Sequence, residues 1–149
     1  MLNTKTIIGW REYIDLPEWG IRGLRAKIDT GARSSALHVE DIKMLTKNRI
    51  RFYVVLNKKD ARKKVIATRV RKGRVKSSIG VKTERWYVQT TLRLGGIEKK
   101  VLVNLVGREG MNFRMLVGRH TIKDDFIVDV NKSFHLTPLK KRKLLKRKK

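Results

Sequence analysis

The sequence contains no cysteine and only two prolines. The missing thiols exclude a disulfide framework, a zinc site with thiolate ligands and a cysteine nucleophile. No apolar run approaches the roughly 20 residues that cross a bilayer. The first ten residues, MLNTKTIIGW, lack the apolar stretch and small residues of a signal peptide. From these absences we expect a cytoplasmic protein with no membrane insertion.

Acidic residues are scarce as well, because 13 Asp and Glu face 38 Lys and Arg, for a formal net charge of +25. Residues 140–149 hold eight cations and no acid, and residues 47–76 hold 13 cations and the single acid Asp60. Such a field attracts polyanions, so acidic peptides and nucleic acids are both candidate partners. We expect a folded domain over residues 1–137 and a basic tail over 138–149. The tail should stay disordered until it contacts a polyanion such as RNA or the ribosome.

Helical periodicity is nearly absent, and alternation of apolar and polar residues dominates. Trp86, Val88 and Leu92 lie on one face of residues 85–94, and the alternation resumes at Ile97 after Gly95-Gly96. This pattern predicts a β-hairpin. It also predicts strands at residues 7–10, 21–28, 36–42, 52–56, 65–70, 114–117 and 126–130, with one helical turn at 120–125. A single all-β domain, closed or partly closed, is expected because closure removes exposed strand edges.

The stretch KIDTGARSSALH, residues 27–38, places a carboxylate at a turn in a strongly basic chain. Asp29 follows a predicted strand, Thr30 offers a hydroxyl that fixes the turn, and Gly31 allows close approach of backbone. A carboxylate held this way in a cleft can polarise water. The alternative is an Asx turn, in which Asp29 only accepts bonds from backbone amides.

Further segments follow this turn in a characteristic order: GWREYIDLPEWGI precedes KIDTGARSSALH, and RLGG, FRMLVGR and FIVDV come after it. Together they resemble the retropepsin-like aspartic proteases. They resemble in particular a family of small bacterial proteins labelled ATP-dependent zinc proteases, some of which are associated with glutamate ligases that extend a ribosomal protein. The resemblance implies a closed retropepsin-like β-barrel with at most one short helix.

Aspartic proteases need two carboxylates around one water, and like charges so close share a proton. The chain has one Asp-Thr-Gly, so the resemblance implies a homodimer in which each subunit supplies one aspartate. It assigns catalysis to Asp29, with Thr30 bracing the pair and Gly31 facing the substrate. The residues expected to support this dyad are Leu116, Val117, Gly118 and Arg119.

One residue departs from the viral pattern, in which an acid after Asp-Thr-Gly-Ala pairs with the arginine that corresponds to Arg119. Arg33 stands at that position, so the contact must be absent or rebuilt with another acid, for which Glu12, Asp124 and Asp125 are candidates. We expect Arg33, with Ala32 and Ser34, to bind substrate, since a guanidinium prefers an acidic side chain. Pairing of Arg33 with a structural acid is the alternative. The best candidate for a flap is residues 74–84.

Other chemistries find less support. The three histidines lack HExxH spacing, and a catalytic zinc needs three protein ligands, so His38 with Glu40 is an incomplete site. No P-loop is present, and we expect no metal or cofactor. We therefore predict an aspartic peptidase of glutamate-rich peptides. The alternative is a nucleic-acid- or ribosome-binding β-protein, in which Phe52 and Tyr53 stack on bases unless they pack as a core face.

Overall fold

The computed structural model describes residues 4–57, 59, 61–76, 79–107, 112–138, 141 and 144. The predicted basic tail, 138–149, lies outside the described residues apart from 138, 141 and 144. Within the described part, no helix is long and apolar enough to cross a membrane.

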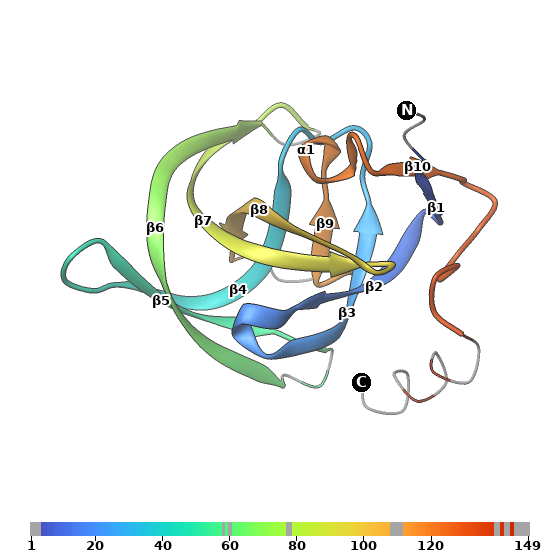
Figure 1. Cartoon of the computed structure of the whole chain (residues 1–149). Helices are drawn as coiled ribbons and strands as arrows, with labels where there is room; N and C mark the ends of the chain where they lie inside the picture. The colour runs from blue at the N-terminus through green and yellow to red at the C-terminus, as the bar shows by residue number, and fades with distance from the viewer. Residues whose placement is uncertain are drawn as a thin grey trace.

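The regular structure of the described chain is mostly β-strand, with one four-residue helix, α1, and one short 3-10 helix, η1 (Figure 1). Eight strands form one sheet in the order β2-β3-β9-β4-β5-β6-β7-β8, and extra pairings of β2 with β7 and of β4 with β8 close it on itself. The closed all-β prediction is confirmed. The elements are β1 (Thr6–Ile8), β2 (Arg11–Leu16), η1 (Pro17–Trp19), β3 (Ile21–Ile28), β4 (Ser35–Met44), β5 (Arg49–Val55), β6 (Arg62–Lys76), β7 (Lys82–Leu94), β8 (Ile97–Val106), β9 (Met115–Val117), α1 (Arg119–Ile122) and β10 (Phe126–Val128).

The longest strand, β6, lets the sheet turn back on itself. Its first half pairs with β5, from Arg62 opposite Val55 to Thr68 opposite Arg49. Its second half pairs with β7, and the register shifts between Arg69 and Arg71. An extra residue in one strand bends it and increases its twist. One continuous strand therefore belongs to both sides of the closed sheet, around a core that includes Phe52, Leu92 and Val103.

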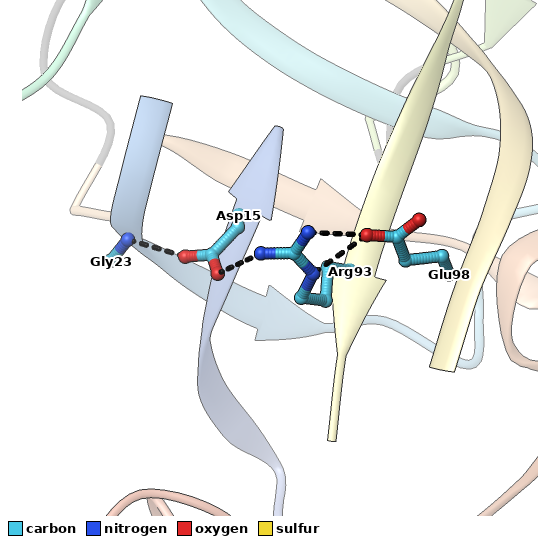
Figure 2. A network of polar contacts seen from close by, with 4 residues as sticks. All are labelled: Asp15, Gly23, Arg93 and Glu98. Atoms are coloured by element: carbon cyan, nitrogen blue, oxygen red, sulfur yellow. Dashed lines mark hydrogen bonds and ion pairs between the residues drawn. The ribbon is translucent and has the colours of Figure 1, made fainter. Parts of the chain in front are cut away.

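The sheet closes where β2 meets β7, at the pairing of Asp15 with Arg93. Figure 2 shows the polar contacts there. Asp15 Oδ1 accepts a hydrogen bond from the Gly23 amide at 2.8 Å, and its Oδ2 lies 3.7 Å from Arg93 Nη1. Arg93 also donates from Nε to Glu98 Oε1 at 2.8 Å. These contacts connect β2, β3, β7 and β8. We call Glu12, Asp15, Arg93 and Glu98 the β2 seam.

Two parts of the sequence prediction need correction. Strand β2 was not predicted, because its inward face carries Glu12, which is fully buried, where an apolar residue is expected. Glu12 accepts bonds from the backbone amides of Gly9, His135 and Leu136 at 2.7, 3.0 and 3.2 Å. The flap segment 74–84 is not simply a loop, since β6 continues to Lys76 and β7 begins at Lys82. The hairpin of residues 85–105 around Gly95-Gly96 is confirmed, with Leu94 opposite Ile97.

Candidate active site

Asp29 comes directly after β3, and the carboxyl end of β3 lies at the same end of the molecule as α1 (Figure 1). Its amide donates to the Val117 carbonyl at 2.8 Å, so β9 fixes the start of the turn. Its Oδ1 accepts a hydrogen bond from the Gly31 amide at 3.0 Å. This is the Asx-type bond that the sequence left open as an alternative. It orients the half-exposed carboxylate through one oxygen, and Thr30 and Gly31 beside it are exposed.

Strand β9 lies between the strands that enter and leave this turn. It runs parallel to β3, with Val117 opposite Ile28, and antiparallel to β4, with Leu116 opposite Ala36. Val117 is fully buried and Leu116 is partly buried. Both residues therefore lie directly beneath the Asp29 turn, where the resemblance placed them.

Gly118 is in close contact with the backbone that follows Asp29. A Cβ at Gly118 would lie 2.5 Å from the Ser34 carbonyl oxygen and 3.1 Å from that of Ala32. Its amide donates to Ser35 Oγ at 3.0 Å, and this hydroxyl also bonds to Thr121 Oγ1 at 2.7 Å. The lack of a side chain at Gly118 is thus what lets α1 pack against the turn.

Arg119 supports the turn, and its side chain forms no ion pair with an acid among the described residues. Its amide donates to the Ala32 carbonyl at 2.8 Å, and its Nη1 donates to the Thr30 carbonyl at 3.1 Å. The proposed rebuilding of this contact with Glu12 or Asp125 is wrong, because Glu12 binds backbone amides and Asp125 pairs with Lys99 at 2.6 Å. A backbone carbonyl takes the place of the acid.

The described part of the chain places no second carboxylate in hydrogen-bonding contact with Asp29. None of the described acids is hydrogen-bonded to Asp29, and most of them bind groups elsewhere. Asp124 is exposed just beyond α1. Glu12 accepts hydrogen bonds from backbone amides, Glu18 accepts one from the Thr91 hydroxyl, and Asp129 accepts one from the Asn131 amide. The remaining described acids form ion pairs with lysine or arginine: Asp15, Glu40, Asp41, Glu84, Glu98 and Asp125. Among the described residues, Asp29 is thus the one carboxylate bonded within this turn.

The three residues expected to bind substrate surround the exposed end of the turn. Arg33 is exposed, and the described part of the chain gives its side chain no ion-pair partner. The structural acid considered for it is therefore not found there. Ala32 is half-buried, and Ser34 Oγ lies 3.3 Å from the Tyr87 hydroxyl. Sequence reasoning did not identify Tyr87, which meets Ser34 only through the pairing of distant strands.

The pair His38 and Glu40 is not assembled as a metal site. His38 is buried with its Nδ1 3.1 Å from Arg114 Nη1, and Glu40 accepts a hydrogen bond from Arg62 at 2.8 Å. Burial first, and then the nearby positive charge of Arg114, lower the pKa of His38. Within the described residues no group of three histidine or acidic side chains is close enough to hold a metal ion.

The aromatic residues considered for base stacking are occupied by the protein itself. Phe52 is fully buried and makes an edge contact with Trp19 at 5.5 Å between ring centroids. The Tyr53 ring is flanked by the guanidinium groups of Arg51 and Arg62 at 5.7 and 5.2 Å. Phe52 therefore packs in the core, and the Tyr53 ring already makes cation–π contacts with two arginines of this chain.

Comparison with known proteins places the chain in a family. A model of the RimB-like family, described as the retropepsin-like aspartic endopeptidase RimB, matches residues 7–138. The chain belongs to this family. The family match confirms the resemblance inferred from the Asp-Thr-Gly turn and the later FRMLVGR segment, and it includes every candidate site residue.

The curated relatives that the chain matches are longer proteins, and the chain spans less than a third of their length. Two of them, from Shewanella pealeana and Desulfotalea psychrophila, are each named probable alpha-L-glutamate ligase and are 28% and 32% identical over 141 and 130 residues. The alignments cover 91% and 84% of this chain but only 31% and 28% of the relatives. A crystal structure of a Legionella pneumophila protein described as of unknown function is 29% identical. It covers 90% of this chain, and all of that protein is matched, with a TM-score of 0.74.

Proposed function

We propose that this RimB-like chain is an aspartic endopeptidase that works as a homodimer, with Asp29 of each copy forming the catalytic pair. The observation that carries the proposal is the single half-exposed Asp29 carboxylate, held by its own turn with no described acid bonded to it. A second copy supplies the missing carboxylate. One carboxylate then removes a proton from water while the other, protonated, donates to the scissile carbonyl. The leaving amine receives a proton in the next step.

The surface beside this turn supports association of two copies. Thr30 and Gly31 are exposed, and no hydrogen bond of the described residues uses the Thr30 hydroxyl. Strands β1 and β10 form a two-stranded sheet in which Ile7 lies opposite Ile127. These side chains are 45% and 54% exposed, an uncovered apolar pair that a second copy would bury.

The substrate that we propose is a glutamate-rich peptide. The net charge of +25 attracts acidic chains, and the exposed Arg33 stands four residues after Asp29. The relatives named glutamate ligases carry a region like this chain within a protein about three times as long. Their name describes the whole protein. The region shared with this chain can therefore catalyse hydrolysis while the rest of the protein adds glutamate. A peptidase specific for glutamyl peptides would shorten the product of such a ligase.

The test is cleavage of oligoglutamate peptides by the wild type and by Asp29→Asn, followed by mass spectrometry of the products. We expect Asp29→Asn to lower kcat/KM by at least roughly 1,000-fold, the scale for removing a central catalytic group. Its melting temperature should match the wild type, because Oδ1 still accepts the Gly31 amide. Cleavage that survives this substitution would refute the role of Asp29.

Mixing the two proteins tests the shared site. A ninefold excess of Asp29→Asn should lower the activity per wild-type chain about tenfold once subunits exchange, because most wild-type chains then pair with an inactive partner. A monomeric enzyme would keep its full activity in the mixture. Light scattering of the wild type at the same concentration gives the mass of the assembly independently.

A further inference from the structure

Charged side chains line the outer face of β3 as far as the catalytic turn. Every second residue from 24 to 28 is buried in the core. The residues that alternate with them are half-buried or exposed: Arg25, Lys27 and Asp29. Successive side chains of a strand point to opposite faces, and the Asp29 amide continues the ladder by donating to the Val117 carbonyl at 2.8 Å. Lys27 and Arg25 therefore share a face with Asp29, about 7 and 13 Å away along the strand.

Strand β2 adds a third cation to this face. Arg11 is directly opposite Lys27, and Tyr13 is directly opposite Arg25. Side chains opposite each other in an antiparallel pair lie on one face of the sheet, about 5 Å apart. Glu12, the residue between Arg11 and Tyr13, points to the core and is fully buried. The outer face beside Asp29 thus carries three cations on two neighbouring strands.

Aromatic rings flank two of these cations. The Arg11 guanidinium lies over the rings of Trp10 and Phe134 at 4.6 and 4.8 Å. The Arg25 guanidinium lies over the rings of Phe113 and Phe134 at 4.8 and 6.0 Å. Trp10 and Phe113 make an edge contact at 6.0 Å between ring centroids. We call Trp10, Arg11, Arg25, Phe113 and Phe134 the arginine–aromatic stack. Its rings hold the cations in place without neutralising them.

Backbone hydrogen bonds tie this stack to the catalytic strand. The Trp10 amide donates to the Lys132 carbonyl at 2.9 Å, and the Phe134 amide donates to the Arg11 carbonyl at 2.9 Å. The Trp10 carbonyl accepts from the amide of Ile28, the residue before the catalytic aspartate, at 2.8 Å. The position of the stack relative to the turn is therefore fixed by the backbone.

The three cations have no acidic partner in the described part of the chain. None of its ion pairs involves Arg11, Arg25 or Lys27. Arg11 Nε donates to the uncharged Ser133 hydroxyl at 2.6 Å, and Arg25 Nε is buried without a hydrogen-bond partner there. Burial first, and then the positive charge of Arg25, lower the pKa of Arg11. A bound anion would relieve this repulsion between like charges.

The spacing of the cations matches that of an extended acidic peptide. Lys27 and Arg25 are two residues apart on one strand, which is about 7 Å. Alternate side chains of an extended peptide lie on one side and repeat at the same interval. A run of glutamates that extends from Asp29 along β3 therefore presents its carboxylates at the spacing of these cations.

We propose that this face binds the substrate, with Lys27, Arg25 and Arg11 binding carboxylates of an acidic peptide whose cleaved bond lies at Asp29. This inference rests on the proposed peptidase function and adds to it the cations that select acidic residues on one side of the cleaved bond. Lys27 is nearest to the cleaved bond, and the arginine–aromatic stack holds the two arginines farther along the peptide.

The experiment measures kcat/KM for an oligoglutamate peptide, for a series with one glutamate at a time replaced by glutamine, and for the peptide amidated at its carboxyl end. The enzymes are the wild type, Lys27→Gln, the double variant Arg11→Gln with Arg25→Gln, and Arg22→Gln. The last is the control, since it removes an exposed cation near the start of β3, far from Asp29. Because Lys27 is exposed, Lys27→Gln should fold even where the double variant, which loses its cation–π contacts, does not.

We expect the sensitivity to glutamine to depend on the cation that is present. In the wild type, glutamine on one side of the cleaved bond should lower kcat/KM about 10- to 100-fold, the scale of a hydrogen bond to a charged group. The nearest position should lose this sensitivity in Lys27→Gln, and a farther position should lose it in the double variant. Arg22→Gln should keep the wild-type pattern. Such non-additivity at one position identifies a direct contact. A loss caused by amidation and abolished in the same variants supports the face with the terminal carboxylate as the bound group.

The outcomes separate this face from the peptidase activity. Unchanged sensitivity at every peptide position in Lys27→Gln, with Asp29-dependent cleavage retained, would overturn the face and leave the peptidase intact. If the wild type cleaves no peptide, the peptidase proposal fails, and fluorescence anisotropy with labelled oligoglutamate decides the face alone. Binding that weakens about tenfold or more in Lys27→Gln, but not in Arg22→Gln, supports the face, and equal binding overturns it. Tighter binding of an RNA oligonucleotide of equal charge through the same residues would also overturn it.

Discussion

The β2 seam and the Asp29 turn use the same kinds of charged residue in opposite ways. In the seam, Glu12 accepts three backbone amides and is fully buried, and Asp15 and Glu98 flank Arg93 (Figure 2). At the turn, the Asp29 carboxylate accepts one amide from its own loop and is half-exposed. A carboxylate whose oxygens accept hydrogen bonds from the protein stabilises the fold. A carboxylate whose oxygens can accept further hydrogen bonds is available for chemistry.

The cations show the same difference. Arg93 forms ion pairs with two acids, Asp15 and Glu98, and these pairs connect three strands. The positive charge of Arg93 is therefore neutralised within the fold. Arg33 is exposed and Arg71 lies over the Tyr87 ring at 4.0 Å, and neither takes part in an ion pair among the described residues. The contrast predicts that damage to the seam changes stability and damage to the turn changes activity.

Replacing Glu12 with alanine is the most severe way to break the seam. The change leaves the buried amide of Gly9 and the part-buried amides of His135 and Leu136 without their acceptor. The free energy of unfolding should fall by about 3–5 kcal/mol, since each buried unsatisfied donor costs about 1–3 kcal/mol. Urea denaturation measures this loss. Glu18→Ala removes an exposed carboxylate whose one hydrogen bond among the described residues comes from the Thr91 hydroxyl, and it should cost less than about 1 kcal/mol. Similar losses for both variants would contradict the role given to Glu12.

Gly118→Ala tests the support of the turn. The new Cβ would overlap the Ser34 carbonyl, so α1 or the turn must shift. We expect a loss of about 1–3 kcal/mol in unfolding free energy, in the range of overpacked sites. Because the shift also moves the backbone after Asp29, cleavage of oligoglutamate should fall more than the folded fraction does. Gly107→Ala is the matched control, since its Cβ would meet nothing closer than 3.8 Å. Wild-type activity in Gly118→Ala would show that the close contact is unimportant.

Arg93→Gln gives the smallest effect and sharpens the comparison from the other side. The Arg93 and Glu98 side chains are 41% and 48% exposed, so solvent screens the pair. Loss of these contacts should cost about 0.5–1 kcal/mol. The activity on oligoglutamate should be unchanged when both proteins are assayed at a temperature at which they stay folded. A clear loss of activity would show that charge anywhere on the surface attracts the substrate, without a specific contact.

Several elements could be predicted from short stretches of sequence. The alternation at residues 85–94 and the Gly95-Gly96 turn predicted the β7–β8 hairpin, and the segment around Asp29 predicted the turn and its family. Strand β2 escaped prediction because Glu12 breaks its apolar face, and its amide partners at His135 and Leu136 lie more than 120 residues away. The acid sought for Arg119 proved to be a backbone carbonyl, which no side-chain pattern reveals.

The sequence by itself determined where most of the strands run and where a carboxylate meets a turn, because period-two alternation and turn chemistry depend on neighbours along the chain. Only the tertiary structure decided which charged side chains form bonds within the fold and which stay exposed at the surface. Glu12 finds its amides, and Ser34 meets Tyr87 and Asn104, through strand register and sheet closure. These contacts join residues far apart in sequence, and their geometry is set by the whole closed sheet.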